Sequence, residues 1–172
     1  MVEIDRVYES KFKFSGIFDF KETYNFVYRW LNDYGYILIQ EKNYVEKIQP
    51  EGKIVEITWE AKKKVSDYFR FFLKLAWLVT GMTSVEVERN GVKVKANKGT
   101  IEIKITGYME KDYEHRWEVT SVSKFLRGIY DRYIIRSRIE SYERKIMEEV
   151  DEVVAQTKSY LELEGIREEL KG

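Results

Sequence analysis

Residues 85–105 read VEVERNGVKVKANKGTIEIKI, and apolar and charged residues alternate through most of this stretch. A period of two is typical of a β-strand with one face in the core and the other in water. Asn90-Gly91 interrupts the alternation, and this dipeptide favours a two-residue hairpin turn because both positions must take a positive φ. The register set by this turn places Glu88 opposite Lys93. The stretch therefore predicts an antiparallel hairpin.

The charge pattern predicts a second turn in the same stretch. The first turn pairs Glu86 with Lys95, and a further two-residue turn at Lys98-Gly99 sets Lys95 opposite Glu102 as well. A three-residue loop would instead mix the charged and apolar faces, so the two-residue turn is favoured. The face opposite the charges is apolar and is expected in the core; it holds Val85, Val87, Val92, Val94, Ala96, Ile101, Ile103 and Ile105.

Upstream of the hairpin, alternating patterns predict strands over 6–14, 36–48 and 53–65, and a 3.6-residue period predicts a helix over 20–34. Asp19 and Glu22 have the spacing of a helix-capping box. Residues 68–80 fit either a helix or a strand, and the strand is favoured because alternation holds over six pairs. The Lys62-Lys63-Lys64 run that precedes them is interpreted as a solvated strand end.

The last third of the chain is predicted to be helical, from Ser121 to about Gly165. Its first apolar stripe, Phe125, Ile129, Tyr133 and Ile134, is expected to close the sheet. Its second follows a nearly straight 11-residue repeat and holds Ile139, Tyr142, Ile146, Val150, Val153, Thr157 and Leu161. A helix over 121–164 would be roughly 66 Å long, whereas a compact domain of this size is roughly 40 Å wide. Either the helix folds back near Ser137 or its second half projects.

These patterns predict an α+β fold: one strand, one helix, six further strands and a long C-terminal helix, with about seven strands in a curved antiparallel sheet packed on that helix. In element order, residues 1–145 resemble the helix-grip fold of the START-like (SRPBCC) superfamily, although one helix follows the first strand where two are usual. The resemblance implies an apolar cavity between sheet and helix. We expect a small apolar ligand there to contact Trp59, Phe71, Leu73, Trp77, Tyr130 and Ile134.

Composition restricts the functional classes. The chain has 172 residues, 30 Lys plus Arg, 30 Asp plus Glu, and no cysteine. Balanced charge argues against general binding to nucleic acid, and the lack of cysteine removes disulfides and thiolate metal sites. The single His115 has no partners in the sequence that would make a catalytic or metal site. We expect a soluble, cytoplasmic protein with no membrane span, resident metal or cofactor, and an enzyme is not favoured.

The C-terminal helix divides into a basic and an acidic half. Residues 124–145 carry seven basic side chains, and residues 146–170 carry eight acidic ones. Antiparallel pairing of two copies would set each half against its opposite charge. The sequence therefore predicts a body over 1–145 and a projecting segment over 146–172 that forms a homodimer through the second apolar stripe. The function predicted first is a non-enzymatic interaction or adaptor module. The alternatives are a carrier or sensor of an apolar ligand and a ribonucleoprotein-associated factor, which would use Lys124, Arg127, Arg132 and Arg136.

Overall fold

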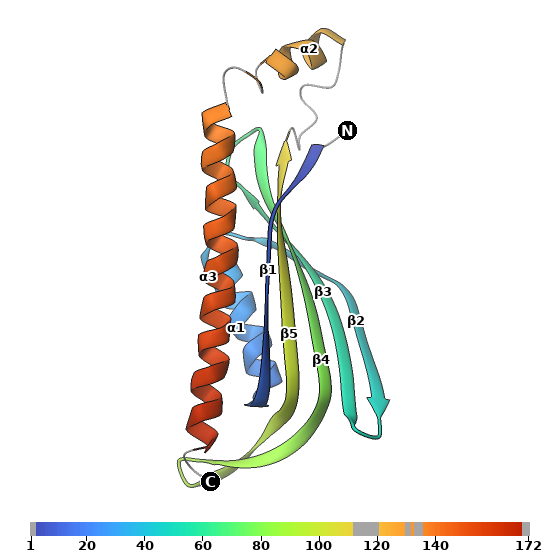
Figure 1. Ribbon diagram of the computed structural model, residues 1–172, viewed down its shortest axis with the longest axis vertical. Helices are drawn as coiled ribbons and strands as arrows, with labels where there is room; N and C mark the ends of the chain where they lie inside the picture. The colour runs from blue at the N-terminus through green and yellow to red at the C-terminus, as the bar shows by residue number, and fades with distance from the viewer. Residues whose placement is uncertain (1–2, 112–120, 130–131, 133–135, 170–172) are drawn as a thin grey trace.

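The computed structural model describes residues 3–111, 121–129, 132 and 136–169. Its elements, in chain order, are β1 (Glu3–Phe18), α1 (Phe20–Asp33), β2 (Leu38–Gln49), β3 (Gly52–Lys64), β4 (Phe69–Arg89), β5 (Val92–Lys111), α2 (Ser121–Ile129) and α3 (Arg136–Glu169). The predicted α+β class is confirmed, with a curved antiparallel sheet and a C-terminal helix (Figure 1). Within the described ranges the sheet has five strands, so the prediction of about seven is wrong.

The strand order is β1-β5-β4-β3-β2, so the first strand pairs with the last and the others form a meander. The register at the Asn90-Gly91 turn is confirmed: Glu88 lies opposite Lys93, and Glu86 lies opposite Lys95. Residues 69–80 are extended, as favoured, but they continue without a break into residues 81–89 to form the long strand β4.

The predicted turn at Lys98-Gly99 is absent, because strand β5 continues through these residues without interruption. Glu102 accordingly lies opposite Lys13 of β1 and Leu78 of β4, and the predicted Lys95–Glu102 pair is wrong. The Lys98-Gly99 dipeptide lies at a bend in the sheet, where the β4–β5 register shifts between Thr80 and Thr83.

Glycines permit this bend because the neighbouring backbones leave no room for a side chain. A Cβ on Gly99 would lie 2.9 Å from the carbonyl oxygen of Thr80, and a Cβ on Gly52 would lie 2.6 Å from the carbonyl carbon of Gly81. Gly52 also has a φ of +129°, which side chains strongly disfavour. Beyond the bend, the hairpin of β4 and β5 curls under α1 and α3 (Figure 1); we call residues 82–98 the arm.

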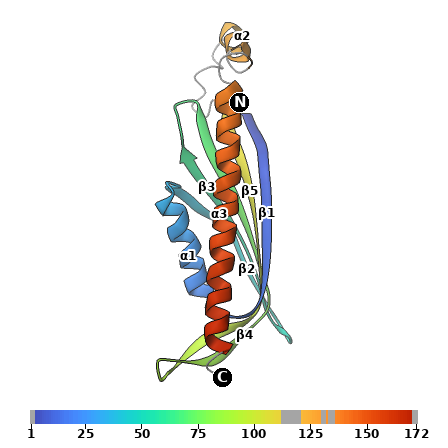
Figure 2. The same ribbon diagram turned by 60° about the vertical axis from the view of Figure 1, so that its left-hand side comes forward.

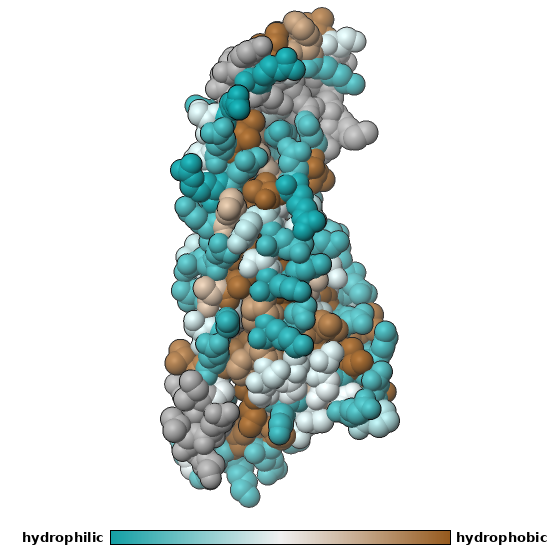
Figure 3. Space-filling model, viewed as in Figure 1, coloured by the Kyte–Doolittle hydropathy of each residue, from teal (hydrophilic) through white to brown (hydrophobic). Residues whose placement is uncertain are grey.

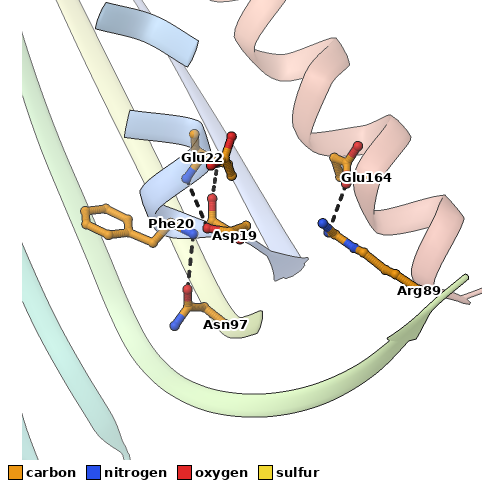
Figure 4. Close-up of polar contacts among 7 residues, drawn as sticks. Asp19, Phe20, Glu22, Arg89, Asn97 and Glu164 are labelled. Carbon is orange, nitrogen blue, oxygen red and sulfur yellow. Dashed lines mark hydrogen bonds and ion pairs between the residues drawn. The ribbon is translucent and has the colours of Figure 1, made fainter. Parts of the chain in front are cut away.

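Helix α1 begins as predicted. The amide of Glu22 donates to Oδ1 of Asp19 at 3.0 Å, and the amide of Phe20 donates to Oδ1 of Asn97 at 3.1 Å (Figure 4). The first contact confirms Asp19 as the N-cap, and the second comes from the arm. On the arm's other strand, Arg89 forms an ion pair with Glu164 of α3 at 3.0 Å (Figure 4). The arm is thus tied to both helices.

Helices α1 and α3 cover the same face of the sheet (Figure 2). Helix α3 has 34 residues, which makes it about 51 Å long. Strands β4 and β5 have 21 and 20 residues, so each strand, measured along its bent path, is at least about as long as α3. The molecule is therefore elongated. The projecting helix was predicted by comparing the helix length with the width of a compact domain, and that comparison does not apply to an elongated one.

Candidate interaction surface at helix α2

The interior between sheet and helices is filled by side chains at the positions predicted to bind a ligand. Trp59, Phe71, Leu73 and Trp77 are all buried in one core cluster. The two tryptophan rings lie 5.1 Å apart between centroids, and Trp59 packs edge-on against Tyr24 of α1 at 4.6 Å. Three clefts among the described residues are lined by other side chains. Tyr130 and Ile134 lie outside the described residues.

The second apolar stripe of the C-terminal helix also lies in this core. Five of its members are at most 1% exposed within the single chain: Ile146, Val150, Val153, Thr157 and Leu161. Ile139 and Tyr142 are partly buried and pack against the same cluster. The stripe that was predicted to form a dimer interface is thus covered, within the single chain, by the sheet and α1. These side chains are not available to a second copy.

A buried polar network links α3 to the sheet. Glu149 of α3, with an 8% exposed side chain, pairs with Lys63 of β3, whose side chain is 13% exposed. The Tyr36 hydroxyl donates to Glu149 at 2.5 Å, and the Lys63 ammonium donates to the Tyr34 carbonyl oxygen at 2.9 Å. Burial, followed by the charge of Glu149, raises the pKa of Tyr36 far above its ordinary value. The Glu149 carboxylate already has two partners, so we interpret the network as a structural contact that holds α3 to the sheet.

The interpretation of the lysine run as a solvated strand end is therefore wrong for Lys63. Lys64 pairs with the exposed Asp67, and Lys62 pairs with Glu110, whose side chain is only 3% exposed. Lys63 faces inward over the rings of Tyr36 and Phe71. The signal was available in the sequence: strand alternation puts Lys63 on the same face as Trp59 and Ala61, both buried.

A cleft of about 340 Å³ lies between the end of β1 and the last turns of α3. Its apolar side chains are Phe14 and Ile17, its charged ones are Lys98 and Glu162, and Ser15, Gly16 and Gly165 complete the lining. The volume is at the small end of the range for ligand sites. Neither this cleft nor its residues were predicted from the sequence.

Helix α2 lies apart from the sheet and from α1, beyond the N-terminal end of α3 in both views (Figures 1 and 2). Val122, Phe125, Leu126 and Ile129 are 66%, 68%, 49% and 38% exposed. Their spacing puts them on one face of the helix, which we call the α2 face. Apolar surface is accordingly visible at this end of the molecule (Figure 3). The prediction that Phe125 and Ile129 close the sheet is wrong; Tyr133 and Ile134 lie outside the described residues.

Several of the described residues near the α2 face are basic. Lys124 and Arg132 are exposed, and together with Phe125, Gly128 and Ile129 they line an open cleft of about 180 Å³. Arg136 and Arg138, in the first turn of α3, are exposed too. A Cβ added at Gly128 would meet no atom within 4 Å. The described residues at this end of the molecule therefore combine an apolar face with basic side chains.

The described residues hold no group of three or more His, Asp or Glu side chains that could bind a metal ion; His115 lies outside them. In the same part of the chain, no helix is both long enough and apolar enough to cross a membrane. No known family model matches this chain, and no curated protein matches it either.

Proposed function

We propose that the protein is a non-enzymatic interaction module, in which the body formed by β1–β5, α1 and α3 carries the α2 face to a partner. The observation that supports this proposal is the exposure of four apolar side chains on one face of a nine-residue helix. A contiguous exposed apolar surface rimmed by polar groups is typical of interaction sites.

Physical chemistry supports a role outside the core for α2. An isolated helix of nine residues is marginal in water, because the cost of nucleation is repaid only over longer helices or by packing. The large buried core of the body consists of other residues, from Phe12 to Leu161, and includes none of the α2 face. A partner that covered the face would supply the packing that α2 lacks.

The proposal is tested with a variant that makes all four residues of the α2 face serine. We expect its free energy of unfolding to stay within about 0.5 kcal/mol of the wild type, as for surface substitutions. In the native state, the wild type should enhance the fluorescence of anilinonaphthalene sulfonate, an anionic apolar dye, and the variant should not. The matched control is Leu163→Ser, which removes a 67% exposed apolar side chain of α3 and should leave the dye signal unchanged. A loss of more than about 2 kcal/mol in the four-serine variant would place the face in the folded core and contradict the proposal.

A second candidate function is that of a carrier for a small apolar ligand. The 340 Å³ cleft beside Phe14 and Ile17 supports it, because apolar side chains meet a charged rim there. Native mass spectrometry of the purified protein tests it. A co-purified small molecule that is lost in a Gly165→Leu variant would support this candidate, since a Cβ at Gly165 would already lie 3.1 Å from the ring of Phe14.

A further inference from the structure

The size of the α2 face limits the partner that it can hold. A stable protein–protein interface takes about 20–30 residues on each side, whereas the α2 face has four residues, one of them only 38% exposed. A lipid surface makes no such demand, because an amphipathic helix binds by inserting a few apolar side chains at the boundary between headgroups and acyl chains. The face is thus small for a protein partner and adequate for a membrane surface.

Charge adds the second argument. The sequence has no net charge, yet Lys124, Arg132 and Arg138 are all exposed at the end that carries α2. Anionic lipid headgroups attract such side chains within a Debye length of the surface. In the cleft of about 180 Å³, Lys124 and Arg132 lie beside Phe125 and Ile129. A phospholipid has the matching arrangement, with a negative phosphate next to apolar chains.

The position of α2 adds the third argument. The helix lies at the tip of an elongated molecule and apart from the sheet (Figures 1 and 2). A flat surface can therefore approach the α2 face without touching the acidic side chains farther along α3, of which Asp151 and Glu162 are exposed. The basic side chains beside α2 would therefore meet an anionic membrane first.

We propose that the α2 face is a peripheral anchor that inserts Phe125 and Leu126 into an anionic membrane surface while Lys124 and Arg132 contact the lipid phosphates. This inference rests on the proposed function, because it names the partner of the same face. The anchor is short, so its membrane affinity is expected to be about that of a single myristoyl chain, ~10⁴ M⁻¹. Binding is then reversible.

The test is co-sedimentation of the full chain with vesicles. One set contains phosphatidylcholine and phosphatidylglycerol in about a 7:3 ratio, and the other contains phosphatidylcholine alone. We expect the protein to sediment with the anionic set only, and less as salt shortens the Debye length. Phe125→Ser with Leu126→Ser should weaken binding at least about ten-fold, and Lys124→Ala and Arg132→Ala about five-fold each.

Two control variants sharpen the result. Lys158→Ala removes an exposed lysine from the far half of α3 and should bind like the wild type. Gly128→Ala, which meets no neighbouring atom, favours the helix and should tighten binding by up to about five-fold. A purely electrostatic contact would not respond to Gly128→Ala, and equal binding by the Phe125/Leu126 variant would overturn the insertion of these side chains.

A partner other than a membrane at the α2 face would give different results in these experiments. If wild-type protein fails to bind vesicles but self-associates through the α2 face, the partner is a second copy; the lipid inference is then overturned while the proposed function stands. Salt-sensitive binding to RNA that requires Lys124 and Arg132 but not Phe125 would also overturn it, in favour of a ribonucleoprotein role. Unfolding of the Phe125/Leu126 variant would instead contradict the proposed function itself.

Discussion

The hydroxyl of Tyr36 and the carboxylate of Glu149 lie 2.5 Å apart in the core, although 113 residues separate them along the chain. Tyr36 follows α1 directly, and Glu149 is on α3, so this contact joins the two helices on the covered face of the sheet. Lys63 completes the network from β3. One carboxylate thus links α3 to β3 and to the segment that follows α1.

Removing Glu149 should therefore destabilise the fold strongly. Glu149→Ala leaves the Lys63 ammonium buried without its counter-charge, and such a change costs about 3–5 kcal/mol. Tyr36→Phe removes one hydrogen bond to a charged group and should cost about 1.5–3 kcal/mol. Urea unfolding followed by circular dichroism measures both.

The double variant Lys63→Met with Glu149→Leu is the control for this prediction. It replaces the ion pair by apolar groups of similar volume, so it should recover the stability lost to the unpaired charge, but not the part that belongs to the hydrogen bond of the buried Tyr36 hydroxyl. If the double variant were as unstable as the single one, packing at these positions, and not the unpaired charge, would explain the loss.

The sequence predicts local features of this fold well and non-local ones poorly. The Asn90-Gly91 turn and the Asp19 cap depend on neighbours within a few residues, and both are confirmed. The Lys98-Gly99 dipeptide also has turn chemistry, but its conformation depends on Thr80 and Gly81, which lie nearly twenty residues away. A bend shared by several strands cannot be distinguished from a turn by the pattern of one strand.

The candidate site was missed for a related reason. Phe125 and Ile129 have the same helical spacing as Ile146 and Val150, yet the first pair is exposed and the second pair is fully buried. Periodicity shows which side chains share a face, but it does not show what covers that face. Only the length of the sheet, which the prediction of seven short strands underestimated, decides how far along the helix the covering extends.

Alkaline pH should destabilise the protein through its tyrosines. Burial and, next, the hydrogen bond to Glu41 raise the pKa of Tyr24 to about 12, and burial and the hydrogen bond to Glu46 do the same for Tyr44, also to about 12. In the unfolded chain both pKa values are about 10. Above pH 10 the unfolded chain therefore loses protons that the folded protein retains, so the free energy of unfolding falls as pH rises from about 10 toward 12.

Unfolding in urea at a series of pH values, with tyrosinate absorbance recorded in parallel, measures this effect. The variant Tyr24→Phe with Tyr44→Phe lacks two of the responsible groups and should show a shallower decline in stability over the same range. An unchanged slope would assign the alkaline loss to other groups, such as the buried Tyr36, whose pKa is raised further.

The glycine bend gives a prediction about stability with an internal control. Gly52→Ala adds a Cβ that would lie 2.6 Å from the Gly81 backbone, at a φ of +129°, and should cost about 2–4 kcal/mol. Gly128→Ala adds the same methyl group to open space and should be neutral or slightly stabilising. Thermal unfolding of the two variants compares them directly, and similar melting temperatures would show that the bend relaxes without cost.

A homodimer through the C-terminal helix remains a prediction, and only the outward face of α3 is open to it. That face is basic early, with Arg138, Arg144 and Lys145 exposed, and acidic later, with Asp151 and Glu162 exposed. Antiparallel pairing of two copies would match these charges. Sedimentation velocity at micromolar concentration should then show a dimer that dissociates as salt is raised, because exposed ion pairs are screened.

Charge reversal tests this interface directly. Arg144→Glu with Lys145→Glu should be monomeric, and so should Asp151→Lys with Glu162→Lys, because each variant sets like charges against each other in the pair. Mixing the two variants should restore a dimer, since the reversed charges of one chain then meet opposite charges on the other. A wild-type chain that sediments as a monomer at these concentrations contradicts the dimer, and a dimer that persists in both variants assigns the contact to another surface, with the α2 face as the next to be mutated.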